Sequence, residues 1–544
     1  MKSIITIILL VTISTINAQV KQEWVSRYNE PGNGQDNANS IAVDGSGNVY
    51  VTGRSRSAGA ITLDDYATIK YNSSGVEQWA SRYNGPANFN DWAYSIAVDG
   101  SGNVYVTGVS AGSIGYYATI KYNSSGVQQW ASLYDGHTSS AERVYSIAVD
   151  NSGNVYVTGS YDVSVYNEDY ATIKYNSSGV EQWVSKYNGP GNADDYTYAI
   201  ALDGSGNVYV TGASDGSGSY NYDYATIKYN SSGVQQWASR YNGTGNFEDN
   251  AYSIVVDGSG NVYVTGRSWG GETNWDYTTI KYNSNGIEQW VQRYNGPGNS
   301  SDEAKSIAVD ALGNVYVTGT SFGSGTGADY ATIKYNASGV EQWVQRYNGP
   351  GNANDNAYSM AVDNSGNVYV TGGNYISITE GGDYATLKYN SSGVEQWVQR
   401  YNGPDNLGDW ALSIALDGSD NVYVTGGSIG IGTYFDYATV KYSQTTTGVY
   451  QTTSDLTYRY SLKQNYPNPF NPLTSIDFSI PIHIHVSLKV FNVLGQEIAV
   501  LVEEELDAGT YTTKWDGTAM PGGIYFYRLQ TRDYSETKKS ILLR

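Results

Sequence analysis

The stretch that decides the fold is S-I-A-V-D-G-S-G-N-V-Y-V-T-G at residues 95–108. Near copies of it recur along the chain at intervals of 51 to 55 residues. The asparagine of the motif stands at Asn48, Asn103, Asn154, Asn207, Asn261, Asn314, Asn367 and Asn421. A unit of this length is too long for one turn of a β-solenoid. It matches a β-propeller blade, in which about 50 residues form a four-stranded antiparallel sheet.

Each unit predicts four short strands, which we call A, B, C and D in chain order. In the second unit they are residues 94–99, 104–108, 117–123 and 127–134, all rich in Tyr, Val, Ile, Thr and Trp. A D-G-S-G-N turn joins A to B, and an N-S-S-G turn joins C to D. Glycine adopts positive φ without steric cost, and Asp and Asn side chains accept hydrogen bonds from nearby backbone amides. The predicted fold class is therefore all-β.

The repeats begin and end in complementary phases. Val20–Tyr28 has the sequence of a lone D strand, whereas the last repeat stops after a C strand at Asp436–Tyr442. If the first strand completes the last sheet, eight sheets close into a ring, and the remaining sheet edges are short and peripheral. We therefore predict an eight-bladed β-propeller, closed by the N-terminal strand, over residues 19–443.

Three further segments flank the predicted ring. Residues 1–18 carry one lysine, a short apolar run and a small-residue end, as in a cleavable secretory signal peptide. Residues 444–457 are a polar linker rich in Ser and Thr. Residues 458–544 alternate apolar and polar positions between turns, which predicts a small Ig-like β-sandwich.

Composition restricts the possible functions. The chain has no cysteine, which excludes disulfides, thiolate nucleophiles and cysteine-ligated metals. Its formal net charge is -21, so a nucleic acid or an anionic lipid surface is not an expected partner. Outside the signal peptide there is no apolar run of about 20 residues, and we expect no membrane insertion.

The C-terminal segment resembles a known family of sorting domains. The resemblance rests on S-L-K-Q-N-Y-P-N-P-F-N-P (461–472), V-F-N-V-L-G-Q-E-I (490–498), W-D-G (515–517) and G-G-I-Y-F-Y-R-L (522–529). These motifs are similar to the C-terminal sorting domain of type IX secretion. The resemblance implies export through the periplasm and across the outer membrane, with the type IX secretion machinery as a partner.

The repeats resemble the SBBP β-propeller repeat family through G-N-V-Y-V-T-G and D-Y-A-T-I-K-Y-N-S-S-G-V-E-Q-W. The resemblance extends over nearly all of residues 19–443. It implies a shape more than a function, and the family is named for seven blades where we count eight.

The eight units differ from one another mainly in their B-to-C loops. Examples are R-S-R-S-A-G-A-I-T-L-D at 54–64 and R-S-W-G-G-E-T-N-W at 267–275. In a propeller the B-to-C and D-to-A loops open on the same face, so we interpret this face as a candidate recognition surface. The alternative is that the B-to-C loop sequences differ only because no function constrains them. The aromatic candidates for ligand binding are Trp269, Trp275, Tyr161, Tyr166, Tyr220 and Tyr375.

An acid recurs eight residues after the tyrosine that ends each D strand. The series is Asp36, Asp91, Glu142, Asp195, Asp249, Asp302, Asp355 and Asp409. A second acid precedes most C strands, at Asp65, Asp169, Asp223, Asp276, Asp329, Asp383 and Asp436, with Tyr116 interrupting the series. Paired carboxylates are suitable ligands for calcium, which is the one cofactor the pattern suggests. The alternative, which we favour, is that each acid bonds the backbone amides of its own turn.

A tryptophan recurs at one position of every D strand. The series is Trp24, Trp79, Trp130, Trp183, Trp237, Trp290, Trp343 and Trp397. A residue present identically in all units indicates packing between blades. The surrounding sequence also resembles the tryptophan-docking repeat of quinoprotein dehydrogenases, but the absence of cysteine disfavours a quinone cofactor.

These observations favour a secreted or surface-displayed binding module for an extracellular glycan or protein. Two alternatives remain. The first is a polysaccharide hydrolase or lyase that uses carboxylates or tyrosines of the variable face. The second is a structural surface or adhesion spacer. A Ser-His-Asp triad is disfavoured, because His137 is the only histidine of the repeat region.

Overall fold

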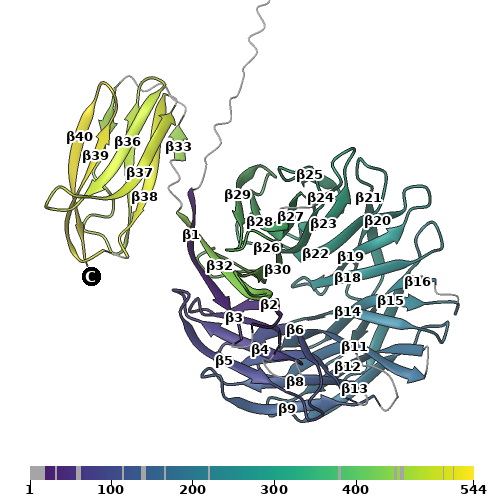
Figure 1. The fold of residues 1–544 in the computed structure, drawn as a ribbon. Coiled ribbons are helices and arrows are strands. Elements are labelled where there is room, and N and C mark those ends of the chain that lie inside the picture. Colours follow the sequence, from purple (N-terminus) through teal and green to yellow (C-terminus); the bar gives the residue numbers. More distant parts are fainter. Residues whose placement is uncertain are drawn as a thin grey trace, which may run out of the picture. The chain divides into compact units, whose positions relative to one another are not determined.

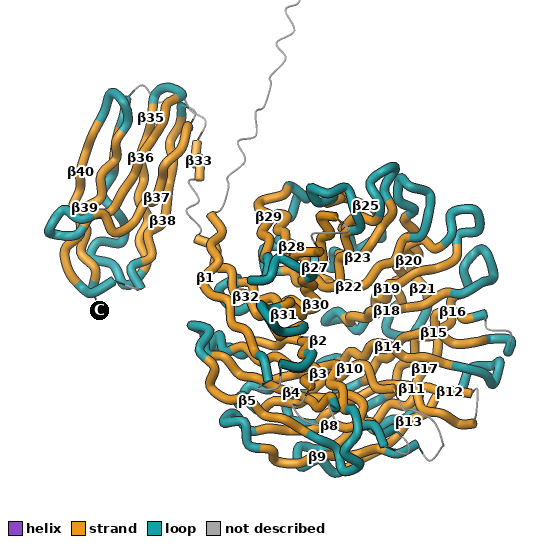
Figure 2. Tube along the Cα trace, viewed as in Figure 1, coloured by secondary structure: helices purple, strands orange, loops and turns teal. Residues whose placement is uncertain are grey.

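The computed structural model describes residues 19–30, 33–56, 63–112, 115–136, 143–164, 167–218, 221–377, 381–445, 450–453, 459–506, 508–518 and 520–543. All regular secondary structure in these ranges is β-strand (Figure 2). One compact unit is Gln22–Ser443, and a second unit includes Gln444–Arg544. The predicted signal peptide, residues 1–18, lies outside the described residues.

The repeat region forms eight four-stranded antiparallel sheets, ordered A, B, C and D from one edge to the other (Figure 1). The first four are β2 (Asp36–Val43), β3 (Val49–Arg56), β4 (Asp64–Tyr71) and β5 (Glu77–Tyr83); β6 (Asp91–Val98), β7 (Val104–Ser110), β8 (Tyr116–Tyr122) and β9 (Gln128–Tyr134); β10 (Arg143–Val149), β11 (Val155–Ser164), β12 (Asn167–Tyr175) and β13 (Glu181–Tyr187); and β14 (Asp195–Leu202), β15 (Val208–Asp215), β16 (Tyr222–Tyr229) and β17 (Gln235–Tyr241).

The other four sheets follow in chain order, and the last includes the N-terminal strand. They are β18 (Asp249–Val256), β19 (Val262–Trp269), β20 (Trp275–Tyr282) and β21 (Glu288–Tyr294); β22 (Asp302–Val309), β23 (Val315–Phe322), β24 (Ala328–Tyr335) and β25 (Glu341–Tyr347); β26 (Asp355–Val362), β27 (Val368–Ser377), β28 (Gly381–Tyr389) and β29 (Glu395–Tyr401); and β30 (Asp409–Leu416), β31 (Val422–Ile429), β32 (Phe435–Thr445) and β1 (Gln19–Tyr28).

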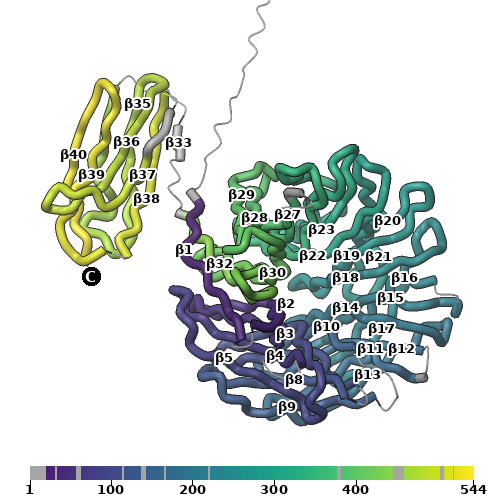
Figure 3. The backbone as a smooth tube through the Cα atoms, in the orientation of Figure 1, coloured from purple at the N-terminus to yellow at the C-terminus, as the bar shows by residue number. Residues whose placement is uncertain are grey.

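The N-terminal strand closes the ring. Strand β1 pairs with β32 as the fourth strand of the last sheet, and the purple and green segments lie side by side in Figure 3. The A strands contact one another around the ring, and β30 contacts β2. Arg27 of β1 donates a hydrogen bond to Asp436 Oδ2 at 2.9 Å. The predicted all-β propeller is confirmed, and its last sheet joins the two ends of the repeat region.

The hydrophobic cores lie between neighbouring sheets. In the core between the first two sheets, Tyr50 and Tyr66 of one sheet pack against Ile96, Val106 and other apolar side chains of the next. Tyr66 is fully buried, and its hydroxyl donates a hydrogen bond to Ala118 O of the next sheet at 3.2 Å. Each sheet is therefore stabilised mainly by apolar surface that its neighbour covers.

A tryptophan connects each sheet to a glycine turn of the next. Trp79 Nε1 donates a hydrogen bond to Ser124 O at 3.1 Å. A Cβ atom on Gly126, which has φ of +81°, would lie 2.6 Å from the Trp79 ring. The same hydrogen bond is donated by Trp24, Trp130, Trp183, Trp237, Trp290 and Trp343 to the next sheet's turn. The tryptophan series therefore packs between sheets, as the sequence predicts.

Trp397 is the exception among the described tryptophans of this series. It is 7% exposed, and its Nε1 has no hydrogen-bond partner. The next sheet in the ring is the closing one, whose C and D strands are β32 and β1 from opposite ends of the repeat region. No C-to-D turn connects these strands, so the usual carbonyl acceptor is missing.

The A-to-B turns are held by their aspartates. Asp99 Oδ1 accepts hydrogen bonds from the backbone N–H groups of Ser101 and Asn103, at 2.9 and 3.0 Å. Its Oδ2 accepts hydrogen bonds from Asn103 Nδ2 and the Tyr105 hydroxyl. Burial acts to raise the pKa of Asp99, but these hydrogen bonds outweigh it and lower the pKa. The repeated motif is therefore a complete turn with its own hydrogen-bonding network.

The C-terminal unit contains two further four-stranded sheets. One is formed by β33 (Tyr450–Thr453), β38 (Gly509–Asp516), β35 (Leu473–Ile480) and β34 (Ser461–Leu462), and the other by β37 (Glu497–Leu506), β36 (Ile484–Phe491), β39 (Gly523–Gln530) and β40 (Ser535–Leu542). Its core includes Phe478, Leu488, Trp515 and Tyr527. The Ig-like classification of this unit stays a prediction.

The expected linker, residues 444–457, differs from the structure in part. Strand β33 lies within it and pairs with β38, with Tyr450 opposite Thr512. Backbone pairing to an available sheet edge gives this polar segment a strand conformation that its composition does not indicate. In the described ranges no helix is long and apolar enough to cross a membrane.

The contact between tryptophan and glycine gives a stability prediction. We expect Gly126→Ala to lower the free energy of unfolding by about 1–3 kcal/mol, because Ala is strained at positive φ and its methyl group would clash with the Trp79 ring. The matched control is Gly100→Ala in the same unit, because a Cβ atom there meets nothing within 4 Å. Denaturant unfolding midpoints measure both variants. Equal midpoints for the two variants would contradict the proposed contact.

Candidate functional site

The first acid series joins two kinds of loop on one face of the ring. Asp249 Oδ2 accepts a hydrogen bond from Gly243 N of the D-to-A loop at 2.6 Å, and its Oδ1 accepts one from Trp269 N at the end of a B strand at 2.9 Å. Asp302 makes the same two contacts in the next unit, with Gly296 N and Phe322 N. We call the face that carries these D-to-A and B-to-C loops the variable face.

The other described members of this series are held in the same way. Asp36, Asp91, Asp195, Asp355 and Asp409 are fully buried and accept hydrogen bonds from backbone amides of the D-to-A loop. Glu142 lies outside the described residues. These contacts agree with the turn-bonding interpretation. No group of three or more acidic or histidine side chains suited to a metal occurs among the described residues. The calcium interpretation stays a prediction.

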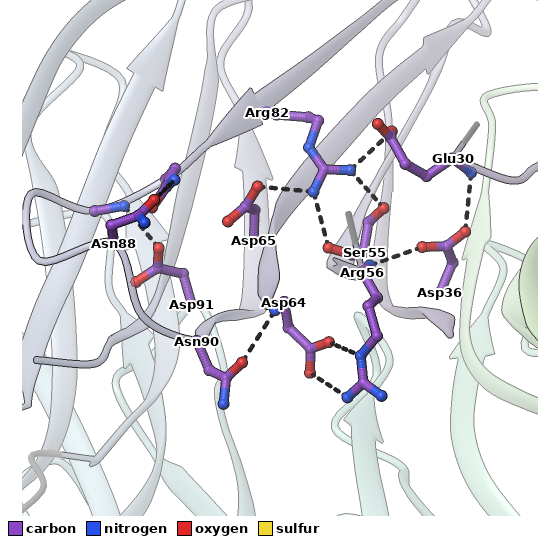
Figure 4. Close-up of polar contacts among 12 residues, drawn as sticks. Glu30, Asp36, Ser55, Arg56, Asp64, Asp65, Arg82, Asn88, Asn90 and Asp91 are labelled. Atoms are coloured by element: carbon purple, nitrogen blue, oxygen red, sulfur yellow. Dashed lines mark hydrogen bonds and ion pairs between the residues drawn. The ribbon is translucent and has the colours of Figure 1, made fainter. Parts of the chain in front are cut away.

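The second acid series forms ion pairs with an arginine of the D strand. Arg82 donates hydrogen bonds to Asp65 Oδ2 at 2.8 Å and to the hydroxyl and carbonyl oxygens of Ser55 at 2.7 and 2.9 Å (Figure 4). It also pairs with Glu30 at 2.8 Å. The equivalent pairs are Arg27 with Asp436, Arg240 with Asp223, Arg293 with Asp276, and Arg346 with Asp329. This series therefore holds the B, C and D strands of one sheet together.

Exceptions to this pairing support the same interpretation. In the second sheet Tyr116 replaces the acid, and Leu133 replaces the arginine. In the third sheet Lys186 replaces the arginine, and its Nζ lies 3.7 Å from the ring centre of Tyr161. Burial there raises the pKa of Asp169 to about 7, and burial raises that of Asp383 to about 6 in the seventh sheet. In the second sheet both partners thus change together, and in the third the acid has lost its arginine. In the seventh sheet Arg400 is present but donates to the Tyr347 hydroxyl at 2.6 Å.

Two of the predicted ligand-binding aromatics lie together on the variable face. The rings of Trp269 and Trp275 are 5.1 Å apart in an edge-to-face arrangement, and Phe247 lies 5.4 Å from Trp269. Phe247, from the D-to-A loop, is 60% exposed. The Arg267 guanidinium lies 4.7 Å from the Trp275 ring centre. We call Phe247, Trp269 and Trp275 the aromatic cluster.

The other predicted aromatics have different environments. Tyr161 is 6% exposed and belongs to a hydrophobic core, so little of its ring faces solvent, and its role in ligand binding stays a prediction. The B strand β11 extends through this position, and Lys186 of the D strand β13 lies over the Tyr161 ring. Tyr375 is half-buried against Trp410 at 6.3 Å. Tyr166 and Tyr220 lie outside the described residues, as does His137.

Sequence reasoning missed a layer of variable positions on the A strands. The residue directly after the first acid varies among Asn37, Trp92, Arg143, Tyr196, Asn250, Glu303, Asn356 and Trp410. The residue three after the acid varies among Asn39, Tyr94, Tyr145, Tyr198, Tyr252, Lys305, Tyr358 and Leu412. These side chains are mostly half-buried, whereas the alanine, valine or threonine between them is buried. Comparing the eight units column by column would have found them.

Four of these residues form an arc of tyrosines on neighbouring A strands. The ring centres of Tyr94 and Tyr145 are 6.2 Å apart, those of Tyr145 and Tyr198 are 5.6 Å apart, and those of Tyr198 and Tyr252 are 5.4 Å apart. Lys305 Nζ continues the arc at 4.5 Å from the Tyr252 ring centre. The layer therefore presents aromatic and hydrogen-bonding groups where the A strands meet.

Glu168, the residue before Asp169, also has a strongly displaced pKa. Burial raises the pKa of Glu168 to about 7, although Arg143 lies 3.9 Å away and acts to lower it. Such a carboxyl group can hold or release a proton near neutral pH. Together with Asp169, it agrees with the hydrolase or lyase alternative.

Family models match both parts of the chain. The description "Beta-propeller repeat" (SBBP) matches residues 23–59, 78–115, 136–160, 182–218, 236–272, 289–325 and 342–372. The description "Secretion system C-terminal sorting domain" matches residues 464–543. Both resemblances expected from the sequence are confirmed.

Individual relatives are distant. An uncharacterized WD repeat-containing protein of Acanthamoeba polyphaga mimivirus is 24% identical over 457 residues, covering 67% of this chain and 31% of that protein. This chain thus spans under a third of the length of that curated relative.

Solved structures share even less sequence with the chain. A fungal alcohol oxidase of the AA5 family with copper shows 11% identity over 97% of this chain and 100% of that one, with a TM-score of 0.39. PorZ, a surface component of the type IX secretion system of Porphyromonas gingivalis, shows 11% identity over 94% and 99%, with a TM-score of 0.20. At such low TM-scores neither structure bears on the function of this chain.

The displaced carboxyl groups predict that stability depends on pH. Asp169 has a folded pKa of about 7 against an ordinary value of 3.8, so the folded state binds its proton more tightly. The contribution of protonated Asp169 to the free energy of unfolding is fully present below the ordinary pKa and is lost as the pH rises through 7. We expect the denaturant midpoint of unfolding to decrease as the pH is raised from 5 to 8. Asp169→Asn should make this decrease smaller and should stabilise the protein at pH 8.

The contrasting variant for this prediction is Asp223→Asn in the next unit. It removes the carboxylate that pairs with Arg240 at 2.8 Å, so it should destabilise the protein at pH 8. An Asp169→Asn protein with the wild-type pH dependence would contradict the assignment of the displaced pKa to this group.

Proposed function

We propose that this chain, which carries SBBP β-propeller repeats and a secretion-system C-terminal sorting domain, is a ligand-binding module that acts outside the cell. The sorting domain indicates export to the cell surface or secretion, and it implies interaction with the type IX secretion machinery. The ligand that we propose is an extracellular glycan or protein, bound by the variable face.

The observation that supports this proposal most strongly is where the eight units differ. The A-to-B and C-to-D turns repeat almost unchanged, and their hydrogen bonds recur from unit to unit. Differences concentrate in the B-to-C loops, the D-to-A loops and the variable positions of the A strands. All three belong to the variable face, so nearly identical sheets display different side chains there. Side chains presented by loops on a rigid framework are typical of recognition surfaces.

The aromatic cluster is the best-defined feature of this face. Edge-to-face packing fixes the Trp269 and Trp275 rings, and Phe247 is largely exposed beside them. Rigid aromatic rings contribute large contact areas with little loss of conformational entropy on binding. Arg267 stacks on Trp275 and pairs with Glu248 at 2.9 Å, so it holds a polar rim beside the rings. Such a surface suits a sugar ring or an apolar protein side chain.

A hydrolase or lyase is the second candidate, favoured by the displaced pKa of Glu168. Turnover of a bound polysaccharide, lost in Glu168→Gln, would identify this activity. A structural spacer predicts neither saturable binding nor turnover.

The binding proposal is tested by a screen of the secreted full chain against a glycan array and candidate extracellular proteins, with calcium and again with a chelator. We expect saturable binding that Trp269→Ala weakens about ten-fold or more, because truncation of a central tryptophan removes a large part of a binding energy. Loss of binding with the chelator would support calcium at the first acid series.

The matched control is Leu312→Ala. Leu312 is 82% exposed in an A-to-B turn, on the face opposite the aromatic cluster, so its loss should leave affinity unchanged. A ligand whose affinity falls in Leu312→Ala and not in Trp269→Ala would place binding on the other face and contradict the proposal.

A further inference from the structure

A pocket of about 380 Å³ opens on the variable face between the sixth and seventh sheets. Thr320, Phe322 and Ala328 line it from the sixth sheet, and Asn356 and Tyr358 line it from the seventh. Its size falls in the range of ordinary small-molecule sites. Four other pockets lie between neighbouring A-to-B turns on the opposite face, where the lining residues repeat from unit to unit.

The pocket exists because two side chains of the sixth sheet are small. Ala328 occupies the C-strand position that holds Trp275 in the fifth sheet. Thr320 occupies the B-strand position that holds Arg267. In the fifth sheet these two large side chains stack on each other at 4.7 Å and fill the corresponding space. In the sixth sheet the space stays open.

The pocket also stays open because of the residue that the seventh sheet places beside it, as a comparison with the next groove shows. Gly373 and Gly382 make the B and C positions of the seventh sheet even smaller. There, however, Trp410 of the eighth sheet fills the space, and a Cβ atom on Gly373 would lie 2.7 Å from the Trp410 ring. The residue equivalent to Trp410 beside the sixth sheet is Asn356, which leaves the pocket open and adds an amide to its wall.

The charged groups at the pocket compensate one another. Glu303 pairs with Lys305 at 2.6 Å and also with Arg267. Arg267 in turn pairs with Glu248 at 2.9 Å. Of these four groups Glu303 and Lys305 line the pocket, where one carboxylate and one cation compensate each other. A compensated wall gives no strong preference for an anionic or a cationic ligand.

The amides of the wall are oriented by bonds through their oxygens. Asn356 Oδ1 accepts a hydrogen bond from the Thr320 hydroxyl at 3.2 Å, and Asn354 Oδ1 accepts one from Ala328 N at 3.1 Å. Each amide therefore has its NH₂ group available to donate, and the Glu303 carboxylate of the sixth sheet also lines the pocket as an acceptor. Phe322 and Tyr358 add apolar surface.

We propose that this pocket binds one neutral sugar residue of an extracellular glycan. A sugar has hydroxyl groups that both donate and accept hydrogen bonds, and it has apolar C–H faces. The pocket offers amide donors, a carboxylate acceptor and aromatic surface, without net charge. The inference rests on the proposed binding function and adds to it a ligand class and a site.

The test uses the full secreted chain and a panel of neutral oligosaccharides built from glucose, mannose, galactose or xylose, with uronate oligosaccharides for comparison. Ala328→Phe places in the pocket the side chain that Phe435 supplies at the same position of the eighth sheet. Asn356→Ala removes one donor without filling the pocket. The control is Leu312→Ala, which changes an exposed side chain of an A-to-B turn on the opposite face.

We expect the wild-type chain to bind a neutral oligosaccharide in preference to uronates, with affinity about ten-fold or more lower in both pocket variants and unchanged in Leu312→Ala. If the neutral oligosaccharide binds both pocket variants as well as wild type, the pocket assignment is overturned and the proposed function remains. If wild type binds no saccharide, the pocket assignment is also overturned. A protein ligand lost in Trp269→Ala would still support the proposed function in that case.

Discussion

Each sheet of this ring is stable only when its neighbour covers it. The tyrosines of one sheet enter the core of the next, and the D-strand tryptophan bonds to a turn of the next sheet. Every sheet has a neighbour on both sides only if the ring is closed. Strand β1 closes the ring by completing the last sheet. Trp397 shows the local consequence, because the contact it would make requires a turn that the two chain ends do not form.

This constraint explains why so much of the repeat is invariant. The turn aspartates, the buried tyrosines and the tryptophans all serve contacts within or between sheets, so a change at one unit disturbs two sheets. Both acid series belong to the same framework. The first series ties the D-to-A loop to the end of the B strand, and the second binds the D-strand arginine. Acidic character on the variable face is therefore largely a consequence of how the loops are held.

The remaining freedom lies on the variable face. Once the buried acids fix the loop ends, the exposed loop residues that the structure describes make no framework contact that recurs in every unit. The side chains at these positions differ in size from one sheet to the next. Arg267 with Trp275, and Trp410 with Phe435 at 4.8 Å, fill the grooves next to two sheets, whereas Ala328 leaves a neighbouring groove open. Nearly identical sheets therefore surround grooves of different shape and chemistry.

Much of the fold could be predicted from the sequence, because it depends on local patterns that repeat. Strand positions, turn chemistry, the role of the tryptophans and the complementary chain ends all follow from residues close together in one unit. The tertiary structure decided what lies between units. It buried Tyr161, a predicted ligand-binding residue, beneath Lys186, and it placed Asn356 opposite Ala328. These outcomes depend on which side chains of neighbouring sheets meet, and a groove is open or filled only when both walls are known.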